Sequence, residues 1–379
     1  MNSYPGYNEE IPGGFRPITA SGTSTAAFIG HIPGDSVEPG ARRWLMSWSD
    51  FAQLAALSPR GGRSWNDLSH AVFGFFLNGG RQCFVVECGA GDKCDLSAAL
   101  KALTEIDVNM VAAPGRTDYE AYAALAAHCA ARRDRLAILD GPARPDDSHL
   151  AVMARTADEA TDGWRMPPAS AFVTLYVPWI SVSDPEGPAG SRVLVPPSGH
   201  LAGLWAANDR KRGVWKAPAN LMVLGALDLS RHFTDAEQDS FNPRGVNALR
   251  DFPGGSIRVW GARTLSADPE WKYVNVRRLM VMIEGSISRG TQWAVFEPNN
   301  EALWAELRRA IEEFLFGLWR AGALLGSKPE EAFFVRCDRS TMTQADLDAG
   351  RGICLIGVAA MRPSEFVNFR ILWTTADGV

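Results

Sequence analysis

The sequence has no run of apolar residues long enough to cross a membrane as a helix. Such a helix needs about 18 or more consecutive apolar residues, and none occurs among the 379 residues of the chain. The opening stretch MNSYPGYNEE is polar and acidic, and it has neither the charged start nor the apolar centre of a secretory signal. We therefore expect a protein that is made and assembled in the cytoplasm, with any release following lysis.

Short motifs for nucleotide and hydrolytic chemistry are also missing. There is no GxxxxGK[ST] loop, no GxSxG elbow and no HExxH word. Gly89-Ala90-Gly91 follows an expected strand, but Cys94 occupies the third glycine position of a dinucleotide loop, which favours a turn. Asp140 at another strand end is a single carboxylate before the turn pair Gly141-Pro142. The sequence predicts no catalytic residue and no cofactor, and an α/β enzyme with an unrecognised cleft remains an alternative.

A basic surplus and paired cysteine motifs are absent as well. The 38 Lys and Arg against 43 Asp and Glu give a net charge of −5, which argues against a general nucleic-acid binder. The spacing of the first three cysteines is not that of a CxxC metal motif. We expect no metal site and expect the cysteines to pack as free core thiols, as small apolar side chains do. The six are Cys83, Cys88, Cys94, Cys129, Cys337 and Cys354.

Strands and helices are predicted to alternate in the first half of the chain. Apolar runs such as CFVV, LAIL and FVTLY are typical of strands buried on both faces. Alternation with helices indicates a largely parallel α/β sheet covered on both sides. The expected strands are AAFIG after Thr25, then 83–88, 108–114, 135–142 and 171–179. The expected helices are 49–57, 64–77, 96–103, 119–133 and 149–161.

A surface segment separates this region from the rest. Residues 182–199 are rich in Pro, Gly and Ser and are expected to form a loop. A helix is expected over 200–208. A small basic cluster follows beside Trp215, and it is either a solvated loop or a contact with an acidic patch on a neighbouring subunit. The cluster consists of Arg210, Lys211, Arg212 and Lys216.

The block from Asn242 to Asn299 combines turns, strands and one amphipathic helix. We expect a strand over 257–260, a helix over 274–288 and a second strand over 291–296. A longer helix over 300–321 has one apolar stripe, which core packing explains, and a charged face with Arg308, Arg309, Glu312 and Glu313 at i,i+4 spacing. Strands over 333–338 and 353–360 complete the region.

Each terminus carries an alternating segment. Tyr7, Glu9 and Ile11 alternate in a Pro- and Gly-rich stretch, for which a disordered tail is the ordinary interpretation. Residues 366–374 read FVNFRILWT, with apolar side chains on one face. This strand is either an edge strand of its own domain or an addition to a sheet in another subunit. Its apolar positions are Val367, Phe369, Ile371 and Trp373.

Several long words resemble the contractile tail sheath proteins of phages and related contractile injection systems. They are RGVNALRDFPGGSIRVWGARTL, VNVRRLMVMIEGSI, TQWAVFEPN and FFVRCDRSTMTQADLDAGR, in the family's order. The opening PGYNEEIPGGFRPITASGTSTAAFIG and the segment 198–220 are also similar to the family. The resemblance implies an α/β sheath domain at 21–232, either with its own core or sharing a core with the C-terminal part, a C-terminal α+β sheath core domain at 233–362, and extended arms at 1–20 and 363–379.

The resemblance also implies a function. Such subunits stack as six-membered rings around an inner tube, and their arms exchange strands with neighbours. The assembly contracts from a metastable extended state and drives the tube through a target envelope. Implied partners are other copies, the inner tube, baseplate and cap proteins, and sheath paralogues, without nucleic acid or membrane insertion. The charged face of the helix at 300–321 could contact the tube. Alternatives are a non-contractile ring-forming terminator or cap, and a paralogue confined to the baseplate end.

Overall fold

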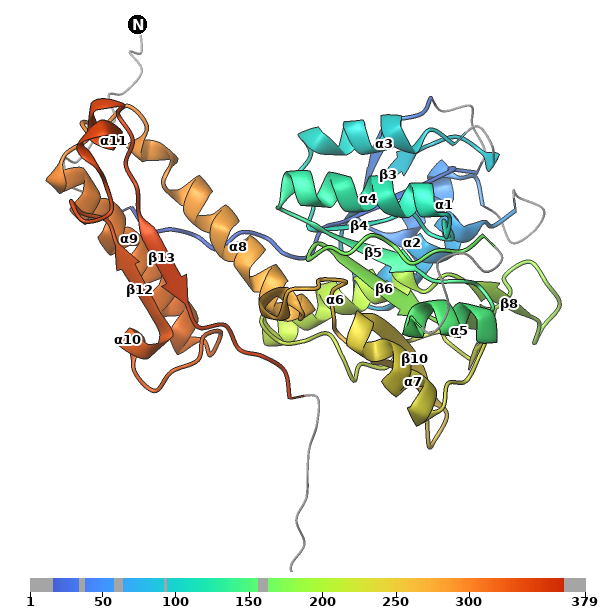
Figure 1. Cartoon of the computed structure of the whole chain (residues 1–379). Helices are drawn as coiled ribbons and strands as arrows, with labels where there is room; N and C mark the ends of the chain where they lie inside the picture. Colours follow the sequence, from blue (N-terminus) through green and yellow to red (C-terminus); the bar gives the residue numbers. More distant parts are fainter. Residues whose placement is uncertain (1–15, 34–37, 58–63, 92–93, 156–162, 365–379) are drawn as a thin grey trace, which may run out of the picture.

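The chain folds into two lobes that are joined by one long helix (Figure 1). The computed structural model describes residues 16–33, 38–57, 64–91, 94–155 and 163–364. The larger lobe contains an eight-stranded sheet with helices on both faces, and the smaller lobe contains helices and a two-stranded hairpin. Helix α8 (Val274–Gly290) runs from the larger lobe into the smaller one.

The central sheet has the strand order β11-β10-β6-β5-β4-β1-β3-β2. The strands from β10 to β3 pair in parallel, and β11 and β2 close the two edges in antiparallel pairing. The interior strands β5 and β6 are mostly apolar and buried at every position, because helices cover both faces of the sheet. The bounds are β1 Ala26–Gly30, β2 Arg42–Leu45, β3 Cys83–Glu87, β4 Met110–Ala112, β5 Leu136–Asp140, β6 Val173–Val177, β10 Val246–Phe252 and β11 Ser256–Trp260.

Helices α3 and α4 lie on one face of this sheet, and α2 and α6 lie on the other (Figure 1). Helices α2 and α6 approach closely, because Gly199 and Gly203 present bare backbone to α2. A Cβ atom at either glycine would collide with the backbone of Ala71 or Phe75. The bounds are α1 Trp48–Leu54, α2 Asp67–Leu77, α3 Leu96–Ala102, α4 Tyr119–Arg132, α5 Asp147–Ala154, α6 Ser198–Arg212 and α7 Asp235–Phe241.

The smaller lobe is built on α8 and α9 (Glu301–Arg320). Both helices are amphipathic, and their apolar stripes meet in a core that includes Leu279, Ile283, Ile311 and Leu315. Strands β12 (Phe333–Arg336) and β13 (Leu355–Val358) form an antiparallel hairpin that packs on α9. The short helices α10 (Pro329–Ala332) and α11 (Gln344–Asp348) flank the hairpin.

The expected alternation of strands and helices in the α/β lobe is confirmed, but the segment around residues 182–199 is not a plain loop. It contributes β7 (Ile180–Ser183) and β8 (Arg192–Val195), which form a small sheet with β9 (Asp228–Leu229). The central sheet also continues past residue 233, where the second domain was expected to begin. Strands β10 and β11 extend it through Trp260.

The strand expected over residues 291–296 is wrong. Residues Gln292–Ala294 form a 3-10 turn, and Phe296 has a positive φ of 73°. A short apolar run forms a strand only where another strand offers hydrogen bonds, and this segment is the connection between α8 and α9. Trp293 is instead stacked by the guanidinium of Arg16, whose central carbon lies 5.0 Å from the ring centroid.

Candidate assembly surfaces

The start of α8 fastens the smaller lobe to the α/β lobe through polar side chains. The Asn275 side-chain amide donates hydrogen bonds to the carbonyl oxygens of Trp215 and Met361, both at 2.9 Å. Trp215 follows α6, and Met361 follows the hairpin of the smaller lobe. This one amide therefore joins three segments that are distant in the sequence.

Arg278 forms a buried ion pair at the same junction. Its Nη1 and Nη2 atoms donate to Asp209 Oδ1 at 2.9 Å and Oδ2 at 2.6 Å. The two side chains are only 3% and 2% exposed. Nη2 also donates to the carbonyl oxygen of Thr23, and the guanidinium lies 4.8 Å from the ring of Trp205. Because both oxygens of the carboxylate are engaged, this geometry is the strong, bidentate form of an ion pair.

Arg277 is held between aromatic rings on the other side of the helix. Its guanidinium lies 4.5 Å from the Phe172 ring centroid and 4.6 Å from that of Trp271. Burial lowers the pKa of Arg277, and the carboxylate of Glu284, 3.2 Å away, opposes that shift. Sequence patterns alone did not single out either Arg277 or Arg278. Two positively charged side chains near the start of a helix are disfavoured by the helix dipole. Their presence at the start of α8 is therefore a sequence signal that each one binds a specific partner elsewhere in the chain.

The chain entering from the N-terminal side lies along α8 in the opposite direction. Ile18 packs against Gly290 at the far end of the helix, where a Cβ atom would be 2.8 Å from the Ile18 side chain. The Ser21 amide then donates to Ser286 Oγ at 2.8 Å. Thr23 reaches Arg278 near the other end. Residues 18–23 are thus fixed to the helix before the chain enters β1.

The two terminal segments leave the described structure at opposite ends of α8. Arg16 lies beside Trp293, beyond the end of the helix, whereas Met361 lies beside Asn275 at its start. At 1.5 Å per residue, the helix between Asn275 and Gly290 is about 22 Å long, so the two contacts lie at opposite ends of it. The arm residues named in the sequence analysis lie outside the described residues. They are Tyr7, Glu9, Ile11, Val367, Phe369, Ile371 and Trp373.

The hairpin of the smaller lobe has open edges. Within the described ranges, β12 and β13 pair in a sheet of two strands, and only the bridge between Leu324 and Ala360 adds to the pairing. A groove of about 600 Å³ lies between β12 and α9. Phe316 and Phe334 are 40% and 47% exposed in it. Its lining consists of Arg309, Glu312, Glu313, Phe316, Pro329, Glu330, Phe333, Phe334 and Val335.

The charged face of α9 lies next to this groove. Arg309, Glu312 and Glu313 are exposed and line the groove, while Arg308 is half-buried. Arg308 Nε lies 4.0 Å from Glu312 Oε1, so the expected i,i+4 pairing of these two residues is present. The structure brings the four predicted side chains together on one helix, beside an apolar groove.

Three residues of the basic cluster, Arg210, Lys211 and Arg212, form the last turn of α6, because the helix continues to Arg212, and Lys216 follows in the turn after it. Arg210 donates to the carbonyl oxygens of Ala206 and Gly79, so it ties α6 to the turn after α2. Lys211 and Arg212 are exposed, and Lys216 is half-buried. Positive charge at a helix C-terminus is favoured by the helix dipole. Arg210 is already bonded within the subunit and Lys216 is half-buried, so Lys211 and Arg212 are the residues of this cluster that are open to a contact with another molecule.

Asp140, the strand-end carboxylate that the sequence offers as a possible catalytic group, has a structural role, because it binds the start of α6 and the loop after β4. Its carboxylate accepts hydrogen bonds from the Gly115 amide at 3.2 Å, the Ser198 amide at 2.8 Å and Ser198 Oγ at 2.7 Å. Asp140 is 2% exposed and Ser198 is fully buried. Burial raises the pKa of Asp140 to about 7, and the three donors oppose this shift. In a catalytic triad, a histidine lies between the serine and the carboxylate and acts as the base. Ser198 is instead buried and bonded directly to Asp140, so it can neither reach a substrate nor transfer its proton to such a base.

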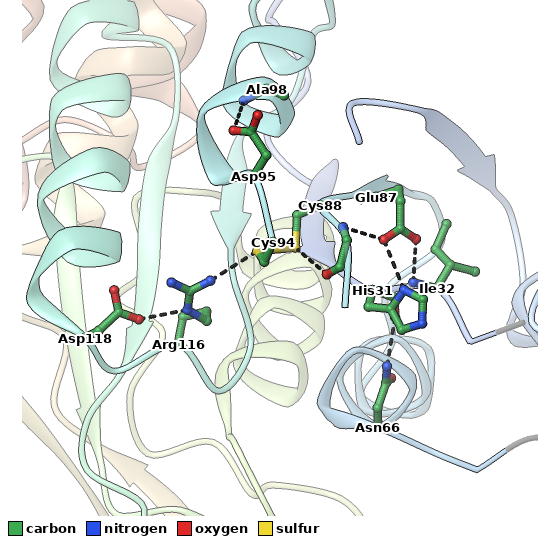
Figure 2. Close-up of a disulfide and its surroundings, with 11 residues drawn as sticks. His31, Ile32, Asn66, Glu87, Cys88, Cys94, Asp95, Ala98, Arg116 and Asp118 are labelled. Carbon is green, nitrogen blue, oxygen red and sulfur yellow. Dashed lines mark hydrogen bonds and ion pairs between the residues drawn. A yellow bond between two sulfur atoms is a disulfide. The ribbon is translucent and has the colours of Figure 1, made fainter. Parts of the chain in front are cut away.

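A cleft of about 490 Å³ opens at the carboxyl edge of the sheet. Figure 2 shows its frame, in which Glu87 accepts from the amides of Ile32 at 2.7 Å and Gly89 at 2.6 Å and lies 3.2 Å from the ring of His31. These contacts fix the loops after β1 and β3. The cleft is also lined by Cys88 and Cys94.

The expectation of six free thiols is wrong for four of them. Cys88 and Cys94 form a disulfide with a Cα–Cα distance of 4.6 Å (Figure 2), and Cys337 and Cys354 form a second one at 4.3 Å. The second pair was placed inside strands, but β12 ends at Arg336 and β13 begins at Leu355, so these cysteines face each other across the hairpin end. Cys83 and Cys129 are free and fully buried, as expected.

Metal-binding clusters and membrane-spanning helices are both absent from the part of the chain that the structure describes. In it, no cluster of three or more His, Cys, Asp or Glu side chains is arranged to hold a metal ion. No helix in the described ranges is long and apolar enough to span a membrane.

Comparison with known families matches most of the chain. Residues 89–265 match the phage tail sheath protein central domain, and residues 266–374 match the phage tail sheath C-terminal domain. The chain is 31% identical to the sheath of the extracellular contractile injection system PVC in its contracted state, with a TM-score of 0.80, covering 100% of this chain and 98% of that one. It is 32% identical to the contracted helical sheath of the anti-feeding prophage, with a TM-score of 0.78 and full coverage of both chains.

Relatives found by sequence are also described as tail sheath proteins. The chain is 26% identical to a putative prophage major tail sheath protein of Pseudomonas aeruginosa over 74% of its own length and 69% of the relative's. It is 24% identical to the tail sheath protein of Enterobacteria phage T4 over 48% of its length, and the matched region spans 28% of the T4 protein.

Proposed function

Because this chain belongs to the phage tail sheath family and is a structural subunit of a contractile sheath, we propose that it stacks as hexameric rings around an inner tube. The assembly is held in a metastable extended state and drives the tube outward when it contracts. Energy for this step comes from re-packing of subunits into a more stable arrangement, so no nucleotide is consumed.

The observation that carries this proposal is the position of the two terminal segments. They contact opposite ends of α8, between which the helix is about 22 Å long. Arms that leave from separate points reach different neighbours, which gives heterologous, head-to-tail contacts. Contacts of this type generate rings and open helices rather than closed pairs. The N-terminal arm, with Tyr7, Glu9 and Ile11, and the C-terminal arm therefore tether each subunit to its neighbours.

The open hairpin is the proposed acceptor for the C-terminal arm of another copy. A strand added beside β12 would complete its unused backbone hydrogen bonds and lie over the groove against α9. The apolar face with Val367, Phe369 and Ile371 matches the exposed Phe316 and Phe334 in character. Each net hydrogen bond contributes about 0.5–1.5 kcal/mol and each buried apolar side chain about 1.5–3 kcal/mol. Several of each outweigh any exposed salt bridge.

Other contacts are assigned from charge and exposure. The mixed charges of Arg308, Arg309, Glu312 and Glu313 on α9 are the proposed contact with the inner tube, and because three of them also border the groove, the arm strand beside β12 would lie next to this contact. The exposed end of α6, with Lys211 and Arg212, is proposed to meet an acidic patch on a neighbouring subunit. Baseplate and cap proteins bind the two ends of the stack. A relative solved in the anti-feeding prophage baseplate, 31% identical with a TM-score of 0.79, supports the baseplate contact.

The test of the arm contact compares three variants of the last strand. Deletion of residues 363–379 is expected to abolish tubes but leave a folded, soluble subunit, because the arm pairs outside its own chain. Phe369→Asp places a charge on the apolar face and is expected to do the same. Asn368→Ala changes the opposite face and is the matched control, expected to assemble normally. Electron microscopy and circular dichroism melting curves are measured for each.

Two results would contradict this proposal. A truncated subunit that still builds tubes would remove the arm from the assembly mechanism. A truncated subunit that melts at a much lower temperature and aggregates would assign the strand to its own domain.

A further inference from the structure

The Cys88–Cys94 disulfide lies where small molecules can reach one of its sulfur atoms. Both cysteines line the cleft at the carboxyl edge of the sheet. Cys88 is 4% exposed, whereas Cys94 is half-buried and more open to the cleft. Attack on a disulfide is governed by access to the sulfur and by the charge around it. The geometry therefore distinguishes the two sulfur atoms.

A fixed cation contacts the accessible sulfur (Figure 2). Arg116 Nη1 lies 3.1 Å from Cys94 Sγ, and its Nε donates to Asp118 Oδ2 at 2.8 Å. Asp118 is itself held by the amide of Ala121, because it caps the N-terminus of α4. The guanidinium is thus held in place by a helix cap and directed at Cys94. A neighbouring arginine favours the thiolate form of a cysteine, which is its reactive form.

We propose that Cys88 and Cys94 are a redox-active pair that exchanges with low-molecular-weight thiols and disulfides through this cleft, with Cys94 as the sulfur that reacts. Arg116 is the positioning residue that stabilises negative charge on Cys94. Nothing in the sheath function calls for this activity, so it stands or fails independently of the assembly proposal.

The exchange balances as a two-electron transfer. In the reducing direction, a small thiolate attacks Cys94 Sγ, the bond between the two protein sulfurs breaks, and its electron pair leaves on Cys88. The Cys88 sulfur takes up a proton, and the carbonyl oxygen of Gly89, 3.5 Å away, can accept the hydrogen of that thiol. A second small thiolate attacks the small-molecule sulfur of the mixed disulfide and releases the Cys94 thiolate beside Arg116. Two small thiols are oxidised to one disulfide, and the reverse reaction uses that disulfide as the oxidant.

The protein contains its own controls. Burial raises the pKa of the Cys83 thiol far above its usual range and that of Cys129 to about 12, so neither reacts near neutral pH. The Cys337–Cys354 pair provides a second disulfide in the same chain, with Cys337 1% exposed. Reactivity at each cysteine can be assigned by mass spectrometry of its own peptide.

The experiment treats full-length protein, reduced and freed of reductant, with oxidised glutathione near pH 7. Wild type is expected to re-form the Cys88–Cys94 disulfide. Cys88→Ser is expected to trap a glutathione adduct on Cys94, whereas Cys94→Ser gives little adduct on Cys88. A one-unit decrease in thiol pKa raises the thiolate fraction near neutrality up to about tenfold. Arg116→Gln is therefore expected to slow alkylation of Cys94 by iodoacetamide by up to about tenfold, with Arg116→Lys between the two.

Any of three outcomes would overturn the proposal. The first is that Cys88→Ser forms no glutathione adduct on Cys94. The second is that Cys94 is alkylated no faster than Cys354 in the reduced protein. The third is that the reduced wild type binds stoichiometric zinc and Cys88→Ser does not. A folding defect of Arg116→Gln would leave the trapping results of the two serine variants as the test. Electron microscopy of the same samples reports on assembly separately.

Discussion

Replacing Arg278 with methionine is expected to destabilise the subunit severely. The change leaves Asp209 as a buried carboxylate, 2% exposed, without the guanidinium that binds both of its oxygens. Removing one partner of a buried ion pair costs about 3–5 kcal/mol, because the remaining charge stays buried without compensation. The hydrogen bond to the carbonyl oxygen of Thr23 is lost as well. That cost is a large part of the total stability of a typical domain.

The matched control is an ion pair on the same helix. Arg289 Nη1 lies 3.0 Å from Asp107 Oδ2, at nearly the same distance, but the two side chains are 49% and 69% exposed. Exposed pairs contribute about 0–1 kcal/mol. Arg289→Met is therefore expected to change the free energy of unfolding by no more than about 1 kcal/mol.

The assay is guanidinium chloride unfolding followed by the fluorescence of the 13 tryptophans. Arg278→Met, Asp209→Leu and the double variant complete a cycle that isolates the interaction. The double variant removes both charges, so it is expected to be much closer to wild type than either single variant. Additive effects of the two single changes, or a loss for Arg278→Met no larger than that for Arg289→Met, would refute the reasoning that this pair fixes α8 to α6.

Two further predictions concern pH and the tube contact. Burial raises the pKa of Asp140 to about 7 and that of Asp67 to about 6, so the folded state binds their protons more tightly than the unfolded state does. Each of the two carboxyls therefore contributes stability that is lost as pH rises, from about 4 to about 7 for Asp140 and from about 4 to about 6 for Asp67, whereas burial lowers the pKa values of His70, His128 and His200, which contribute in the opposite direction. The prediction is therefore a difference between two proteins: from about pH 4 to about pH 7, the free energy of unfolding of Asp140→Asn should change with pH more positively than that of wild type, by up to about 1.4 kcal/mol per pH unit, and equal slopes would show that Asp140 stays ionised. Charge reversal by Arg308→Glu on α9 should prevent co-assembly with the inner tube while leaving self-assembled tubes intact, as electron microscopy would show. Loss of both kinds of particle would instead assign this face to contacts between subunits.

The fold of the α/β lobe was largely predictable because buried parallel strands and amphipathic helices leave strong patterns. The run LAILD is buried at every position, and its apolar character indicates this directly. Strand β2, with the sequence RRWL, is mostly exposed on the sheet edge and has no such pattern. The segment 291–296 has the composition of a strand but forms a 3-10 turn, and the described residues place no strand beside it. Local sequence does not encode whether a partner strand is available.

The contacts that join the lobes were not predictable for a related reason. Asp209 and Arg278 are 69 residues apart, and each looks like a surface charge when its own helix is considered alone. The cysteine pairs likewise depend on how turns bring sulfur atoms together, which spacing alone does not determine. In contrast, the charged face of α9 was predicted from its i,i+4 spacing, because that pattern is local to one helix.

The most direct test of the central claim is electron microscopy of the purified full-length protein without other components. The account predicts long hollow tubes built from stacked six-membered rings, in the contracted arrangement, because no inner tube is present to hold the extended one. Discrete monomers at high concentration, or closed single rings that never lengthen, would contradict it.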